Sequence, residues 1–216
     1  MNHSPFTSAA RAFPPQVLGG LTQSHHQREA MQFAYLDASN LWLGAAHVSA
    51  VHRGLARSAL DAARAGCLDR SLRVNFRAVR DFAVGAGAFN ARTVFVGSVK
   101  TPADHRISAA ATRASWLADM RVRSAFGPEK EVDTSLTVYM LEDLLPRQAD
   151  AGTLEVTLFS GDRDLAPPVR SLARKGIAVD IAVWQHQLSR ELASEARSVY
   201  FLDDHFDQLT FRALAS

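Results

Sequence analysis

The chain has 216 residues, of which 47% are hydrophobic and 21% charged, with 12 glycines, 8 prolines and one cysteine. This length is typical of one large domain with a tail, and the composition excludes collagen-like, low-complexity and disulfide-scaffold proteins. Because Cys67 is the only cysteine in the sequence, an intrachain disulfide and a cysteine-based zinc site are excluded. The segment 1–29 lacks the pattern of a secretory signal, and no apolar run reaches the length of a membrane span. We therefore expect a cytoplasmic protein that does not enter a membrane.

The net charge of +2 conceals an uneven distribution of charge along the chain. Residues 51–130 contain 14 Lys or Arg against 6 Asp or Glu, whereas residues 131–216 contain 8 against 14. This asymmetry indicates a polyanionic partner beside an acidic centre, unless it reflects solvated charges that are merely unevenly scattered.

The expected organisation is a flexible tail over residues 1–30, which is polar and aperiodic, followed by one domain over residues 31–216. Within this domain, short apolar runs alternate with longer helical patterns. The runs predict strands at 33–36, 93–97, 156–159, 178–183 and 199–202, and the patterns predict helices near 54–66, 74–86, 106–119, 133–146, 166–175 and 189–196. This alternation predicts an α/β fold with a parallel sheet covered by helices on both faces.

Acidic residues stand where the predicted strands end. Asp37 ends the first strand, and Asp162 and Asp164 directly follow the strand at 156–159. Asp133 opens the predicted helix at 133–146. Ligands of an open α/β sheet bind at the carboxyl ends of its strands, so we expect these acids to converge there. Two carboxylates about 4 Å apart repel by about 4 kcal/mol at an effective dielectric constant of about 20, and a cluster therefore binds a cation or takes up protons. Oxygen ligands favour Mg²⁺ or Mn²⁺, either of which can activate water against a phosphodiester.

Each acid also has a structural alternative. Asp37 could cap the following helix or form an Asx turn with Ser39 or Asn40. Asp164 could cap the helix that carries Pro167, and Asp133 could cap its own helix.

Three segments carry a family resemblance: Tyr35-Leu36-Asp37-Ala38-Ser39-Asn40, Lys130-Glu131-Val132-Asp133 and Ser160-Gly161-Asp162-Arg163-Asp164-Leu165. Together they resemble the NYN domain of the PIN-like nuclease superfamily, and within it the LabA-like bacterial proteins, over roughly residues 32–205. The resemblance implies a PIN-like, Rossmann-like fold and RNA cleavage that depends on Mg²⁺ or Mn²⁺. It implies that the catalytic residues are Asp37, Asp133, Asp162, Asp164 and Asn40. Asp37, Asp162 and Asp164 would bind the metal, and Asn40 would hold a metal-bound water or a phosphate oxygen.

The sequence departs from the family pattern in several places. Glu131 replaces the usual glycine, and Tyr139 stands where many relatives have a further aspartate. The alternative hypothesis is therefore an NYN-fold protein that binds RNA or a protein partner without cutting. A phosphatase of the haloacid-dehalogenase type is a third hypothesis, but Ser39 stands where that fold needs the second acid of its Asp-x-Asp motif.

The candidate phosphate contacts are basic residues, because arginine pairs bidentately with phosphate oxygens. They are Lys130, His105, Arg106, Arg73 and Arg77. Single-stranded RNA is the favoured partner, and a homo-oligomer is compatible with the sequence. Trp42 and Trp116 could stack on bases, but their apolar helical positions favour the core. His186, which follows a predicted strand, is a candidate substrate contact.

Overall fold

The structure is a computed structural model that describes residues 30–88, 90–99, 102–122 and 130–212. The predicted tail lies, except for Ala30, outside these residues. Within them, no helix combines the length and apolar character that crossing a membrane requires.

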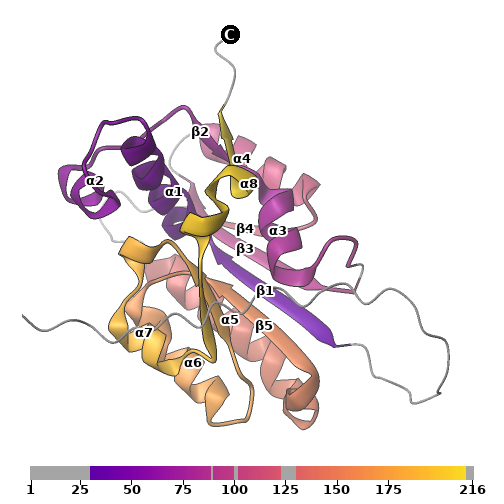
Figure 1. Ribbon diagram of the computed structural model, residues 1–216. Coiled ribbons are helices and arrows are strands. Elements are labelled where there is room, and N and C mark those ends of the chain that lie inside the picture. The colour runs from indigo at the N-terminus through magenta and orange to yellow at the C-terminus, as the bar shows by residue number, and fades with distance from the viewer. Residues whose placement is uncertain (1–29, 89, 100–101, 123–129, 213–216) are drawn as a thin grey trace, which may run out of the picture.

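A six-stranded sheet forms the centre of the molecule, with the strand order β4-β3-β1-β5-β6-β7 (Figure 1). Every neighbouring pair in this sheet is parallel. The strands are β1 (Met31–Asp37), β3 (Arg92–Val99), β4 (Leu117–Val122), β5 (Leu154–Phe159), β6 (Asp180–Val183) and β7 (Ser198–Phe201). The predicted α/β fold with a parallel sheet is thus confirmed.

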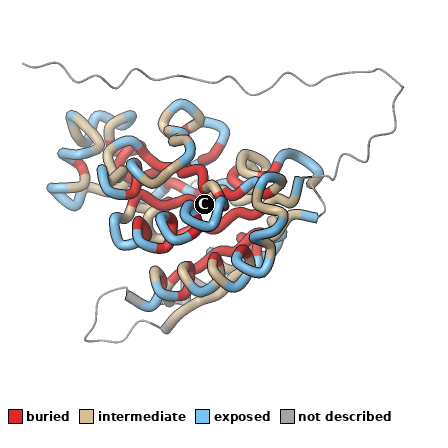
Figure 2. Tube along the Cα trace, turned by 90° about the horizontal axis from the view of Figure 1, so that it is seen from below, coloured by how far each residue is buried: buried red, intermediate tan, exposed pale blue. Residues whose placement is uncertain are grey.

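Helices cover both faces of this sheet. On one side lie α1 (Ala38–His52), α3 (Phe76–Val84) and α4 (Pro102–Arg113), and on the other α5 (Lys130–Leu144), α6 (Ala166–Ala173) and α7 (Arg190–Glu195) (Figure 1). Alternate residues of β1 pack against the two helix layers, because successive side chains of a strand point to opposite faces of the sheet. Phe33 and Tyr35 belong to the core beneath α5 and α6, whereas Ala34 and Leu36 belong to the core beneath α1 and α3. Figure 2 shows the buried strands between these more exposed helices.

A second, two-stranded sheet lies beside the α1 layer. It pairs β2 (Leu72–Val74) antiparallel with β8 (Thr210–Arg212), and α2 (Ala59–Ala65) and α8 (Phe206–Leu209) lie nearby in the fold. The sequence patterns predicted neither of these three-residue strands.

Two further elements differ from the sequence prediction. The helix expected at 106–119 ends at Arg113, because Ser115 adopts a left-handed conformation (φ 64°) and the chain turns into β4. The helix α1 was not predicted, because buried residues occupy every position from Gly44 to Ala50 and hide the one-sided periodicity of a surface helix.

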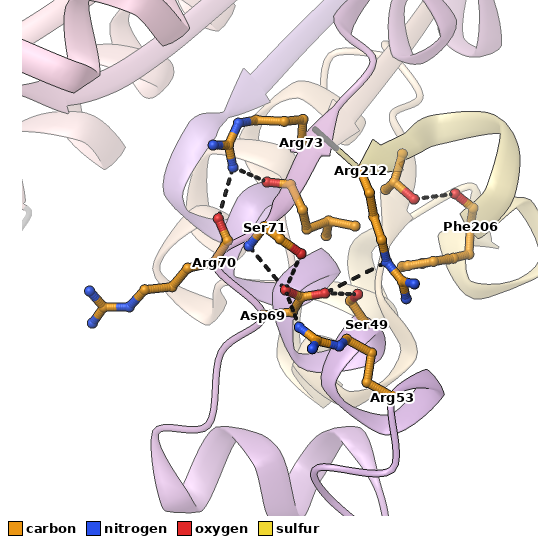
Figure 3. A network of polar contacts seen from close by, with 10 residues as sticks. Ser49, Arg53, Asp69, Arg70, Ser71, Arg73, Phe206 and Arg212 are labelled. Atoms are coloured by element: carbon orange, nitrogen blue, oxygen red, sulfur yellow. Dashed lines mark hydrogen bonds and ion pairs between the residues drawn. The ribbon is translucent and has the colours of Figure 1, made fainter. Parts of the chain in front are cut away.

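Asp69 links α1 to the small sheet (Figure 3). Its side chain is fully buried, and it accepts hydrogen bonds from Ser49 Oγ at 2.7 Å, Ser71 Oγ at 2.6 Å and Arg53 Nη1 at 3.0 Å. Arg212 of β8 approaches it to 3.9 Å. Burial by itself raises the pKa of this carboxyl, but the hydrogen bonds from Ser71, Ser49 and Arg53 outweigh burial and hold the pKa far below its ordinary value.

We expect Asp69→Ala to lower the free energy of unfolding by about 2–4 kcal/mol, because it removes a charged acceptor and leaves Ser49 without its partner. Urea denaturation at pH 7 measures this loss. The matched control is Asp204→Ala at an exposed position, which should change stability by less than about 0.5 kcal/mol. Equal stability of the two variants would contradict a structural role for Asp69.

Candidate active site

A pocket of about 150 Å³ lies at the carboxyl edge of the large sheet. β1 neighbours β3 on one side and β5 on the other, so the pocket lies where the order of the strands reverses, the usual position of ligands in open α/β sheets. Its walls come from the end of β1, the first turns of α1 and α5, and the loops after β5 and β6. The lining residues are Asp37, Ser39, Asn40, Leu43, Val132, Asp133, Asp162 and Gln187.

Asp37 is the N-cap of α1 and is only 4% exposed. Its Oδ1 accepts hydrogen bonds from the backbone N–H groups of Ser39 at 3.0 Å and Asn40 at 3.1 Å, and from Ser39 Oγ at 2.8 Å. These bonds satisfy N–H groups that the first turn of a helix leaves without partners. The capping alternative for Asp37 therefore holds, and the same bonds fix the carboxylate at the pocket wall.

The two acids of the Ser-Gly-Asp-Arg-Asp segment differ in position. Asp162 lines the pocket and caps a short 3₁₀ turn, with its Oδ1 accepting from the N–H of Asp164 at 2.9 Å. Asp164 is not among the lining residues. Its side chain is 65% exposed and lies 3.6 Å from Nε of Arg163. The alternative that Asp164 caps α6 is wrong, since α6 begins after Leu165 without a side-chain cap.

Asp133 enters the pocket from the first turn of α5, which starts at Lys130. A carboxylate in the first turn of a helix is favoured by the helix dipole. Within the described residues, no three Asp, Glu, His or Cys side chains are close enough together to hold a metal ion. The acids thus share one pocket without forming a closed metal cage, although their oxygen donors are of the type that Mg²⁺ and Mn²⁺ prefer.

Gly161 joins the two sides of the pocket. Its N–H donates to Oδ1 of Asn40 at 3.1 Å, and its carbonyl accepts from the N–H of Ser189 at 3.0 Å. A Cβ at this position would lie 2.3 Å from the backbone oxygen of Gln187. The close approach of two loops therefore requires glycine in the Ser-Gly-Asp segment.

Gln187 is a pocket residue that the sequence analysis missed. Its Oε1 is buried without a hydrogen-bond partner among the described residues, and it packs so tightly on Gly44 that a Cβ there would lie 2.2 Å away. With the oxygen enclosed against α1, the amide nitrogen is the polar group that the side chain can offer to a ligand. Its position after β6 was the available signal, although only the neighbouring His186 could be named as a candidate from the sequence.

His186 forms a contact with a second histidine beside the pocket. Its Nε2 lies 3.2 Å from Nδ1 of His47, which is 8% exposed on α1. Burial lowers the pKa of both rings, and for His186 the proximity of His47 lowers it further while Asp203 opposes the shift.

The other predicted site residues do not line the pocket. Arg73 on β2, Arg77 on α3, and His105 and Arg106 on α4 are exposed, whereas the side chain of Lys130 lies outside the described part of the structure. Tyr139 donates its hydroxyl to Oδ2 of Asp119 at 2.9 Å, and burial together with this bond raises the pKa of the tyrosine. Trp116 is buried, as expected, and its Nε1 donates to the carbonyl of Phe76.

We expect Gly161→Ala to destabilise the fold by about 1–3 kcal/mol, because the new methyl group would force the backbone at Gln187 away from the pocket. Thermal unfolding measures the effect. Gly152→Ala is the matched control, since a Cβ there meets nothing within 4 Å. Unfolding of both variants at the same temperature would show that the two loops do not need this close contact.

The histidine pair predicts a dependence of stability on pH. Because both pKa values are lowered by folding, the unfolded chain binds more protons, and the stabilisation present above pH 6.5 decreases as the pH falls below it. The slope should reach at most about 1.4 kcal/mol per pH unit for each histidine. His47→Gln should flatten the dependence between pH 7.5 and 5.5 in urea denaturation, whereas the exposed control His105→Gln should retain it. A wild-type slope in His47→Gln would contradict this account.

Comparison with known proteins is consistent with this geometry. The NYN domain family matches residues 56–203, which is more than half of the chain and includes Asp133 and Asp162. A crystal structure of a protein of unknown function from Vibrio parahaemolyticus RIMD 2210633 has a similar fold, with a TM-score of 0.51 and 12% identity over 88% of this chain and 100% of that chain. No curated protein matches the sequence. Because the family match spans most of the parallel sheet and two acids of the pocket, the chain belongs to the NYN domain family and has a PIN-like nuclease fold.

Proposed function

We propose that this protein is a ribonuclease that hydrolyses phosphodiester bonds with the help of Mg²⁺ or Mn²⁺. The observation that carries the proposal is the meeting of Asp37, Asp133 and Asp162 in one pocket at the carboxyl edge of the sheet. Membership of the NYN family supports it, because NYN domains are generally nuclease-like and bind RNA.

The charge of the pocket supports a divalent cation as the cofactor. Three carboxylates line a space of about 150 Å³, together with the hydroxyl group of Ser39 and the amide groups of Asn40 and Gln187. Asp37, Asp133 and Asp162 would hold the ion in part through water molecules that it retains, because the three carboxylates are not close enough to enclose it directly. The ion would supply charge neutralisation and activation of water.

The carboxamides would contact the substrate. Oδ1 of Asn40 is engaged by the N–H of Gly161, so the group that Asn40 can offer is its N–H₂ donor. Gln187, with its oxygen enclosed against Gly44, offers the same kind of donor. Non-bridging phosphate oxygens are acceptors, and two amide donors in the same pocket as the carboxylates would help to orient a phosphodiester.

Asp164 and the basic residues would complete the substrate path. The exposed carboxylate of Asp164 would join the metal site by turning from Arg163 toward the pocket. Arg73, Arg77, His105 and Arg106 would contact the phosphates of a bound strand, as would Lys130.

The test is Mn²⁺-dependent cleavage of an unstructured RNA by Asp37→Asn and Asp162→Asn. Asparagine is as good an N-cap as aspartate, so these changes remove charge and keep the cap. We expect the rate of cleavage to fall by about 100-fold or more, with wild-type thermal stability.

Two further variants sharpen the result. Asp204→Asn at an exposed position is the control and should cleave at the wild-type rate. Asp164→Asn measures the contribution of the acid outside the lining. Wild-type cleavage by both pocket variants would refute the proposed site.

A second candidate function is RNA binding or a regulatory interaction without cleavage. Two observations favour it: the acids form no closed metal cage among the described residues, and Tyr139 replaces a further aspartate of the family and bonds to Asp119 instead. RNA binding by the wild-type protein with no cleavage at any Mn²⁺ or Mg²⁺ concentration would select this function.

A further inference from the structure

The outer face of the small sheet exposes an aromatic side chain beside an arginine. Arg73 of β2 and Phe211 of β8 are directly opposite in the antiparallel register, so their side chains share one face. Phe211 is 53% exposed, whereas Leu72 and Val74 on the inner face are buried. The phenyl ring of Phe211 is therefore exposed to water, although the opposite face of the same ribbon packs on the core.

Positive charge is concentrated in the part of the sequence that carries β2. Between residues 53 and 80 the sequence has seven arginines and two aspartates. Both aspartates already accept hydrogen bonds: Asp61 from Ser58 Oγ at 2.8 Å, and the buried Asp69 from its serine and arginine partners. The local excess of arginine is therefore not neutralised within this segment.

The arginine beside Phe211 is also held in place. Nη1 of Arg73 donates to the backbone oxygens of Arg70 and Leu72, at 2.8 Å each (Figure 3). A guanidinium group oriented in this way loses less conformational freedom when it binds an anion.

We propose that this ribbon face, formed by Arg73 and Phe211, binds single-stranded RNA outside the pocket. A base stacks on Phe211, and Arg73 contacts a phosphate. An aromatic platform combined with basic side chains is the chemistry that single strands require, since the bases of a duplex are not available for stacking. The proposal rests on the proposed function only in that RNA is the ligand. β8 lies outside the segment that the NYN family matches.

The ribbon face and the pocket are separated by the length of α1. Asp37 caps the first turn of this helix, and Ser49 and Arg53 at its other end hold Asp69. Fifteen helical residues span about 22 Å, which is about six nucleotides of a stacked strand. A strand of twelve nucleotides is therefore long enough to occupy both places at once.

The experiment measures binding of the full chain to a fluorescently labelled 12-nucleotide single-stranded RNA by anisotropy, in EDTA and over a range of salt concentrations. Phe211→Ala should weaken binding at least about fivefold, which corresponds to about 1 kcal/mol. Phe211→Tyr keeps an aromatic ring and should bind the RNA with the wild-type affinity. Arg73→Gln should weaken binding and lower the slope of log affinity against log salt by about 0.7.

Leu117→Ala, which truncates another exposed apolar side chain, and Arg174→Gln, which removes an arginine from the opposite layer, are the matched controls. Both should bind RNA as the wild type does. All variants change exposed side chains, and their melting temperatures verify folding.

Unchanged affinity in Phe211→Ala and Arg73→Gln would overturn the proposal, as would a wild-type protein that binds protein partners but no RNA. Cleavage in Mn²⁺ is measured separately on the same variants. Binding that depends on Phe211 without any cleavage would overturn the nuclease proposal and support the ribbon face. Cleavage by the wild-type protein, together with equal RNA affinity of the wild type and Phe211→Ala, would support the nuclease proposal and overturn the ribbon face.

Discussion

The parallel pairing of β1 with both β3 and β5 is the constraint on which the pocket depends. In the register of β1 and β5, Leu36 lies beside Phe159, so the residues that follow, Asp37 and Ser160, leave the sheet at the same edge. The chain continues from β1 into the α1 layer, whereas β5 is reached from the α5 layer. The two layers separate at this point, and the space between them is lined by acids from both.

A carboxylate that caps a helix can also serve as an acid of the pocket. Asp37 and Asp162 each use Oδ1 to hold backbone N–H groups, and these bonds fix the direction of the side chain without removing its charge. A pocket acid oriented by its own helix needs no additional residue to position it. This is the physical reason why a sequence pattern could not separate the structural interpretation of these acids from the functional one.

Much of the fold could be predicted from the sequence, because β1, β3, β5, β6 and β7 are apolar runs bounded by polar residues. The failures have distinct causes. The helix α1 is buried on nearly all sides, so its sequence shows no apolar stripe along one face. The strand β4 was missed because the pattern at 106–119 predicts one continuous helix, whereas the left-handed Ser115 ends the helix and β4 begins after it. Three-residue strands such as β2 and β8 are too short for any period to appear.

The candidate site was predictable only in part for a similar reason. The acids at strand ends could be named from spacing, but the different exposure of Asp162 and Asp164 arises from a 3₁₀ turn that no spacing predicts. Gln187 depends on the close packing of its oxygen against Gly44, a residue 143 positions away. Contacts of this kind exist only in three dimensions.

The hydrogen bond between Asn40 and Gly161 also determines how much of the chain must be synthesised before the pocket can form. It joins residues 121 positions apart, and Trp184 Nε1 reaches back over 143 positions to the carbonyl of Leu41. A growing polypeptide folds from its N-terminal part first, so β1 and α1 are made long before the loops that complete the pocket. A fragment that ends before β5 has Asp37 and Asp133 but lacks Asp162 and Gln187. The complete pocket therefore forms only after β5, β6 and the loops that follow them have been synthesised.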